Sequence, residues 1–380
     1  MVAHPPKEKR KVQISGKSSC MISLPKRWVK EMELTQGSLL AITRHSSTSL
    51  LISADSNLVS KPSTGEEVVT LYVPVPEAPE ATVRKIACLY VQGYNLIKVK
   101  LGDNPLNSLN KTAIREHVRR LLIGVEIVSD SSDGLLLQIL LGKSELSIEN
   151  ALKRMSIVSS TMLEDAVSSL RSLDRRRAHD VIEKDEIQRF GFYASRQILG
   201  TISHDLFKDG GDMLEPADLT VYLQVSKSIQ YIADCARDIA QKATLLESPP
   251  SDNAVEYITR MSEFASEIFD AAVLSFFKKD SKAAERTIER SKNLVMLERE
   301  ISSSTKGRMS TENVAQTFTI AGAVSSLARI IHFSRDMAEL VLYLTSEQYV
   351  TVNNGTGSRS ASMLLKETPV LQSSPSHSAE

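Results

Sequence analysis

The sequence predicts a multidomain chain: a small β-rich head, a small α+β middle layer and a long all-helical region. Three observations predict this order. Residues 10–54 read as short strands separated by turn residues, residues 66–144 mix strand and helix patterns, and residues 145–350 show only long amphipathic helices. A length of 380 residues leaves room for two or three domains.

The head is predicted to contain four short strands, at residues 11–14, 20–24, 39–42 and 50–52. A short helix begins at Pro25, because proline is favoured in the first turn of a helix, and continues to about Met32. A segment of this size cannot enclose a core of its own. We therefore expect the head to dimerise, which makes the protein a homodimer.

The middle layer, residues 66–144, reads in the order β-α-β-α-β-β. The predicted strands lie at 67–73, 95–101, 125–128 and 135–140, and the predicted helices at 77–92 and 109–122. The last two strands form a predicted hairpin around residues 131–134, whose Ser-Ser-Asp-Gly sequence is typical of a turn.

The helical region, residues 145–350, contains an internal repeat. Arg154-Met155-Ser156 aligns with Arg260-Met261-Ser262, and the same offset places Asp174 on Asp280 and Ala178 on Ala284. The second copy is shorter, and the Gly210-Gly211 loop is the natural place for the deletion. Each copy, about 147–245 and 251–347, reads as three helices. These are predicted at 147–173, 175–204, 216–245, 251–278, 280–306 and 310–347.

Three further segments are polar and lack hydrophobic periodicity. Residues 1–9 and 351–380 are predicted to be disordered, because they cannot bury enough apolar surface to fold. Residues 55–65 are predicted to be a linker between the head and the middle layer.

Composition describes an ordinary globular protein, with 42% apolar and 24% charged residues. The three cysteines lie far apart, which argues against a disulfide framework and fits a reducing compartment. The N-terminus lacks the apolar stretch of a signal peptide, and no apolar run approaches the ~18 residues that span a bilayer. These features predict a cytoplasmic protein with no transmembrane segment.

Charge is unevenly distributed although the formal net charge is zero. Residues 1–55 carry an excess of Lys and Arg of about +5, so the rest of the chain carries about −5. A basic head on an acidic body predicts that only the head contacts a polyanion.

The motifs of common enzyme classes are absent from the sequence. There is no phosphate-binding glycine loop, no G-x-S-x-G elbow and no H-E-x-x-H pair. The seven histidines show no shared metal-ligand spacing. The sequence therefore predicts a protein that is not an enzyme.

The head resembles the AbrB/SpoVT family in its order and spacing of motifs. These are a basic strand at 10–17, the strand end and basic helix Ser23-Leu-Pro-Lys-Arg-Trp28, and the turn Leu34-x-x-Gly37. The resemblance implies that each chain supplies half of a swapped-hairpin β-barrel that docks on DNA. It also implies DNA contacts by Arg10, Lys11, Lys17, Lys26 and Arg27. The alternative interpretation is that these are solvated charges on a dimerisation module.

The duplicated helical region resembles the PhoU family, and the whole arrangement resembles the archaeal phosphate uptake regulators. The residues that carry the resemblance are the two Met-containing helix starts, Asp174 and Asp280 at helix junctions, and the segment at 232–240. The resemblance implies an all-α bundle of two three-helix repeats and a role linked to phosphate uptake.

A metal site is a further implication of this resemblance, because PhoU proteins often carry Glu-x-x-x-Asp in the third helix of each copy. Here the matching positions hold Gln230 and Ala328, so the first carboxylate is missing in both copies. Shifted pairs survive one turn later, and residues four apart share a helix face. The candidate ligands for a divalent or iron-type metal ion are Asp234, Asp238, His332 and Asp336. Alternatively, Asp238 and Asp336 pair with Arg237 and Arg335.

Two functional hypotheses remain open. The first is a transcriptional regulator of phosphate uptake, in which the helical region senses phosphate status and controls a dimeric DNA-binding head. The second is a regulator without DNA, which docks on the ATPase of a phosphate ABC transporter, or on another phosphate-signalling protein, and inhibits uptake.

Overall fold

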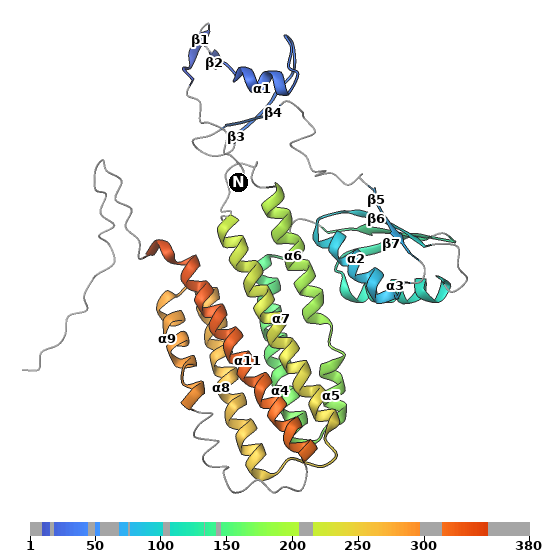
Figure 1. Cartoon of the computed structure of the whole chain (residues 1–380), viewed down its shortest axis with the longest axis vertical. Coiled ribbons are helices and arrows are strands. Elements are labelled where there is room, and N and C mark those ends of the chain that lie inside the picture. The colour runs from blue at the N-terminus through green and yellow to red at the C-terminus, as the bar shows by residue number, and fades with distance from the viewer. Residues whose placement is uncertain are drawn as a thin grey trace, which may run out of the picture.

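The structure is a computed structural model, and its elements are shown in Figure 1. It describes residues 10–15, 19–44, 50–53, 68–74, 77–101, 107–132, 134–141, 146–204, 216–296 and 314–348. The predicted disordered segments 1–9 and 351–380, the predicted linker 55–65 and the Gly210-Gly211 loop lie outside these residues.

The head consists of two separate hairpins and a short helix. Strand β1 (Gln13–Ser15) pairs with β2 (Ser19–Met21), and β3 (Ala41–Arg44) pairs with β4 (Leu50–Ser53), both antiparallel. Helix α1 (Lys26–Glu31) lies between the hairpins in sequence. The described strands form two two-stranded sheets that do not hydrogen-bond to each other. One chain therefore forms small sheets here, and the predicted barrel is not closed within it.

The middle layer is a four-stranded sheet with two helices, as the sequence predicts. Its strands are β5 (Val68–Val73), β6 (Leu96–Leu101), β7 (Val125–Ser131) and β8 (Gly134–Ile139), and its helices are α2 (Pro79–Val91) and α3 (Asn107–Leu121). The spatial order is β5-β6-β8-β7, in which β5 and β6 are parallel and the other pairs are antiparallel.

Helices α2 and α3 cover one face of this sheet. In β6 the apolar Ile97 and Val99 are buried in the same cluster as Ile86 of α2 and Val118 of α3, whereas Lys98 alternates with them in sequence and faces the opposite side. The close approach of β8 to β6 requires a glycine, because a Cβ at Gly134 would collide with the backbone of Val99.

The body is a bundle of long helices (Figure 1). They are α4 (Ile148–Ser172), α5 (Arg175–Ile182), α6 (Glu186–His204), α7 (Pro216–Leu245), α8 (Asp252–Lys278), α9 (Ser281–Ser291) and α11 (Val314–Leu344), followed by the 3-10 turn η2 (Ser346–Gln348). Within the described ranges, none of the helices combines the length and the apolar composition that a bilayer span needs.

Two helix predictions were wrong. The helix predicted at 280–306 ends at Ser291, and the segment predicted as a single helix at 175–204 is two helices, α5 and α6. The chain leaves the first helix at Glu183 and begins the second at Glu186. Arg237 of α7 donates hydrogen bonds to the carbonyls of Ile182 (3.3 Å) and Lys184 (3.1 Å) that the break exposes. Since an unpaired carbonyl at a helix end is costly, this arginine stabilises the break.

The internal repeat is visible in the geometry of the two copies. Asp174 caps α5 by accepting from the backbone N–H of Arg177 (3.0 Å), and Asp280 caps α9 by accepting from Ala283 (2.9 Å). The residue before each cap has left-handed backbone, with φ of 56° at Leu173 and 49° at Lys279. Both copies therefore use the same αL ending followed by the same carboxylate cap.

The predicted bundle seam in α7 is also confirmed. All five of its members have an exposed fraction of 1% or less: Val225, Ile229, Ile232, Ala236 and Ile239. They pack in one continuous core with apolar side chains of both copies, including Met155 and Met261. The 4-3-4-3 spacing of the seam thus correctly predicted which face of α7 is buried.

The middle layer is joined to the body by Arg196 of α6. Its guanidinium donates hydrogen bonds to the backbone carbonyls of Tyr90, Gly93 (3.3 Å) and Tyr94 (3.1 Å) and to Oδ1 of Asn95 (2.5 Å). It also lies over the ring of Tyr90, 4.9 Å from the centroid. Burial lowers the pKa of Arg196. A cation at the C-terminal end of α2 is favourable because it lies at the negative end of the helix dipole, and its hydrogen bonds fix the two parts together.

Candidate nucleic-acid interface

The described part of the head has no buried side chain. The buried apolar residues of the described chain begin only at Val83 in α2. Apolar side chains are instead exposed, among them Ile14 of β1 (81%), Leu39 just before β3 (91%) and Ile42 of β3 (64%). Exposed apolar side chains at this density are typical of an interface rather than of a finished domain. The described head therefore contains apolar residues but does not bury them in a core of its own.

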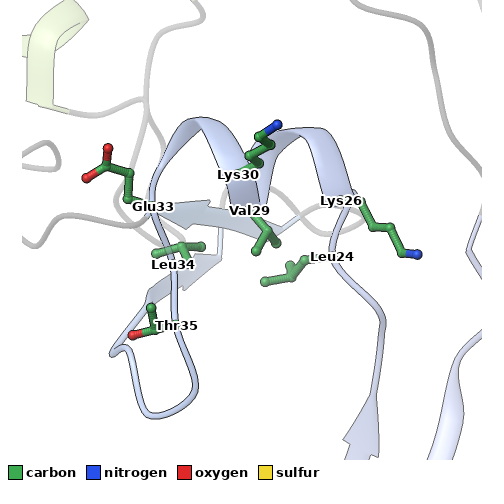
Figure 2. A pocket seen from close by; sticks show the side chains of 7 residues that line it. All are labelled: Leu24, Lys26, Val29, Lys30, Glu33, Leu34 and Thr35. Carbon is green, nitrogen blue, oxygen red and sulfur yellow. The ribbon is translucent and has the colours of Figure 1, made fainter.

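Helix α1 separates its apolar side chains from its charged ones. Figure 2 shows Leu24, Val29 and Leu34 gathered beneath the helix, whereas Lys26 and Lys30 point away from them. These apolar side chains line an open hollow of about 540 Å³, together with Lys26, Lys30, Glu33 and Thr35. The three apolar side chains at its centre are only partly buried by the described chain.

The turn after α1 fixes where Leu34 lies. The backbone N–H of Leu34 donates to the carbonyl of Val29 (3.0 Å), and Glu33 between them has a left-handed φ of 52°. This closing turn brings Leu34 back under the helix. The polar face of the helix points outward, and Lys26 and Lys30 on it are exposed to solvent.

Four of the five predicted DNA-contact residues lie within the described head, and all four are exposed. Arg10 and Lys11 precede β1, and Lys26 and Arg27 form the first turn of α1. Lys17 lies outside the described residues. Whether these side chains contact DNA stays a prediction.

Arg27 already has a partner within its own helix. Its Nε donates to Oε1 of Glu31 at 2.8 Å, and this hydrogen bond raises the pKa of Arg27. Both side chains are more than half exposed, so the pair contributes little stability and can open in favour of a phosphate. Among the residues that the structure describes, Lys26 has no ion-pair partner. It is therefore the stronger candidate for a phosphate contact on α1.

Lys30 is a further cation of this surface that the resemblance to the AbrB/SpoVT family did not indicate. It is exposed and lies four residues after Lys26 on α1. Residues four apart share one face of a helix, and this spacing is the signal that identifies Lys30 in the sequence. Lys26, Arg27 and Lys30 share this helix with Glu31, and Glu33 follows it, so residues 26–33 carry a net charge of +1.

The four predicted metal ligands do not gather into one site. Among the described residues, no group of three or more His, Cys, Asp or Glu side chains is placed to hold a metal ion. Asp234 pairs with Arg237 (2.5 Å), and Asp336 pairs with Arg335 (3.4 Å). His332 lies exposed on α11. Each of these two carboxylates has an arginine of its own helix as its counter-ion.

Asp238 connects the two copies, because it lies on α7 and binds side chains of α11; it does not join the other predicted ligands in a metal site. It accepts from Lys242 of its own helix (2.5 Å) and from Arg329 (3.1 Å) and Ser326 of α11. Burial alone raises the pKa of Asp238, but these hydrogen bonds and cations outweigh it, so the pKa lies below the ordinary value. Its neighbour Arg237, the partner expected from the sequence, binds Asp234 and the α5–α6 break instead.

Comparison with known proteins gives one family match. The PhoU domain model matches residues 152–243 and 258–341, which lie within the two predicted copies. No curated protein matches the chain.

Two solved structures are similar to the chain over about half of its length. The first is PhoU from Pseudomonas aeruginosa, with 22% identity, a TM-score of 0.45, and coverage of 53% of this chain and 96% of that one. The second is the phosphate transport system regulatory protein PhoU from Streptococcus pneumoniae, with 15% identity, a TM-score of 0.44, and coverage of 54% and 96%. On the family match, the helical body of this chain is similar to the PhoU domain in both of its copies.

Proposed function

We propose that this chain is a homodimeric regulator of phosphate uptake that acts by binding rather than by catalysis, and that its head binds DNA. The observation that carries the regulatory role is the pair of PhoU domain matches, which span both copies of the helical body. In this proposal the helical body senses phosphate status, and the head binds DNA in response.

The proposal that the head binds DNA as a dimer has two supports. None of its described apolar side chains is buried and several are exposed, and a second copy is the simplest partner that would cover them. Its exposed cations, which include Lys26 and Lys30 on one helix, would be doubled in number by that second copy. Doubling the cations on one surface raises the affinity for a polyanion, because each neutralised phosphate releases counter-ions.

Communication between body and head is part of the same proposal. The Arg196 joint ties the middle layer to α6, so a change in the packing of the bundle moves the sheet with it. The sheet begins at β5, directly after residues 54–67 that follow the head. A change in the body would thereby alter the spacing of the two heads on DNA.

A second candidate function is favoured by the extent of the family match. The PhoU domain model matches only the helical body, so nothing in that match calls for DNA. In this alternative the head is a dimerisation device, and the body docks on the ATPase of a phosphate ABC transporter and inhibits uptake.

A salt titration of DNA binding separates the two functions. We expect the full-length protein to shift duplex DNA, with affinity falling steeply between about 50 and 200 mM salt. The variant Lys26→Ala/Lys30→Ala removes four cations per dimer. If all four contact phosphates, the slope of log affinity against log salt becomes shallower by roughly 3 to 4.

The matched control removes the same number of cations from the body. Lys282→Ala/Arg286→Ala changes two exposed residues of α9, and we expect it to leave the salt slope unchanged. Absence of any shift by the parent protein at about 50 mM salt would refute DNA binding. Co-purification with the transporter ATPase in that case would establish the alternative.

A further inference from the structure

The outer edge of strand β5 lacks a hydrogen-bonding neighbour among the described residues. It is the end strand in the order β5-β6-β8-β7. Its sequence, Val-Val-Thr-Leu-Tyr-Val, contains no charged residue and no proline. Every second residue of an edge strand directs its N–H and C=O groups outward, and a long apolar edge of this kind is a template for pairing with another strand.

The opposite edge of the same sheet is protected. Strand β7 has an irregularity between Ile127 and Ser129, and it carries Glu126 and Asp130. The carboxylate of Asp130 is held by Lys111 and Arg115 of α3. Bulges and charges are the features by which natural sheets prevent pairing at an edge. Within the part of the chain that the structure describes, the sheet therefore has one edge closed to partners and one edge open to them.

The face of the sheet away from α2 and α3 carries the most exposed side chains of β5. Val68 is 47% exposed and Tyr72 is 69% exposed, and the two lie four residues apart on the same face. Lys100 of β6 lies over the ring of Tyr72, with its Nζ 5.5 Å from the centroid. An added strand beside β5 would cover the other side of both exposed residues.

We propose that β5 pairs antiparallel with β5 of a second copy of this chain, about a twofold axis perpendicular to the sheet. The two four-stranded sheets then form one continuous sheet. Its outer edges are the two β7 strands, so the assembly closes as a dimer and offers no open edge for further growth.

The side chains of β5 select one register for this pairing. A twofold axis perpendicular to the sheet keeps each side chain on its own face, so one residue of β5 must lie opposite the same residue of the second copy. If that residue is Thr70, Val68 of each copy lies opposite Tyr72 of the other. Pairs of an aromatic and a β-branched side chain are among the stabilising cross-strand pairs.

The strand that pairs with the outer edge of β5 is proposed to come from a second copy of this chain. Identical strands satisfy a twofold antiparallel pairing without any further sequence requirement. If the head dimerises, residues 54–67 tether the two β5 strands at an effective concentration of about millimolar. Only this tethering depends on the proposed function.

Cysteine cross-linking of the full-length protein tests the pairing. The background variant replaces the exposed Cys20 and Cys88 by serine and keeps the buried Cys235. Thr70→Cys places two thiols opposite each other, at the roughly 4.5–5.5 Å Cα separation that a disulfide accepts. Val128→Cys, at an exposed position on β7, is the matched control.

We expect Thr70→Cys to form a disulfide-linked dimer under mild oxidation about tenfold faster or more than Val128→Cys, because pairing raises the effective concentration of its thiols. The outward amides of β5 should also exchange slowly with solvent in the unmodified protein. Equal rates at the two positions would overturn the proposal. Slow amide exchange on β5 without the cross-link would also overturn it, because a different partner then occupies the edge.

Head variants keep this test separate from the test of DNA binding. Lys26→Ala/Lys30→Ala should abolish or weaken the DNA shift and leave the Thr70→Cys cross-link unchanged. If the parent protein binds no DNA but still cross-links at residue 70, the DNA-binding proposal fails and the sheet pairing stands. If DNA binding is intact but the cross-link does not form, the sheet pairing alone fails.

Discussion

The head and the helical body differ in how far one chain buries its own apolar side chains. In the body, large side chains such as Phe269 and Leu152 are completely buried in a core that spans both copies. In the described head no side chain is buried, and Leu39 is 91% exposed. The body is therefore a complete hydrophobic unit, whereas the head depends on something outside the chain to bury its apolar side chains.

The largest expected effect tests this difference directly. Phe269→Ala removes a fully buried ring, and we expect it to lower the free energy of unfolding of the body by about 3–5 kcal/mol. Val29→Ala in the head is the counterpart, and it should change the unfolding of the body by less than about 0.5 kcal/mol. Urea denaturation followed by helical circular dichroism measures both. Equal losses from the two variants would contradict the division.

The Arg196 joint tests whether the middle sheet belongs with the body. Arg196→Met removes the guanidinium donor from the carbonyls of Gly93 and Tyr94, which follow α2, at a cost of about 2–3 kcal/mol. We expect the sheet to unfold before the bundle in this variant, visible as faster hydrogen exchange of β6. Arg189→Met, at an exposed position of the same helix, is the control. Identical exchange in the two variants would mean that the joint does not hold the sheet.

The helix caps test whether the two copies of the body are equivalent. Asp174→Ala and Asp280→Ala each remove a side-chain acceptor from a helix start, and we expect each to cost about 1 kcal/mol. Asp180→Ala, at an exposed position in α5 away from the cap, should cost much less. Thermal unfolding of the three variants provides the comparison. A large difference between the two cap variants would show that the repeat is not energetically symmetric.

The smallest expected effect concerns Asp238 and acid. Its pKa is lower in the folded chain than in the unfolded one, so its contribution to stability is present above the unfolded pKa of about 3.9. That contribution is lost as the pH falls through the folded pKa. Asp238→Asn should therefore be less stable than the parent at neutral pH and approach it below about pH 4. The more exposed Asp234→Asn is the control, and a constant gap at all pH values would exclude ionisation as the cause.

The sequence by itself determined the features that rest on local patterns. Asp174 and Asp280 could be placed at helix junctions because the repeat aligns them, and the buried face of α7 followed from its 4-3-4-3 spacing. The β-α-β-α-β-β order of the middle layer followed from alternation and turn residues. In the head, the positions of the strands and of the basic residues were also visible in the sequence.

Only the tertiary structure decided the features that rest on contacts between distant residues. The break between α5 and α6 depends on Arg237, more than fifty residues away in α7, which binds the exposed carbonyls. Arg196 looks in the sequence like any arginine on an amphipathic helix, yet it is a buried joint. Asp238 was expected beside Arg237 or a metal ion, and it bridges α7 and α11 instead. Local periodicity specifies which face of an element is apolar, but the partner of a polar side chain depends on where the fold brings the other elements.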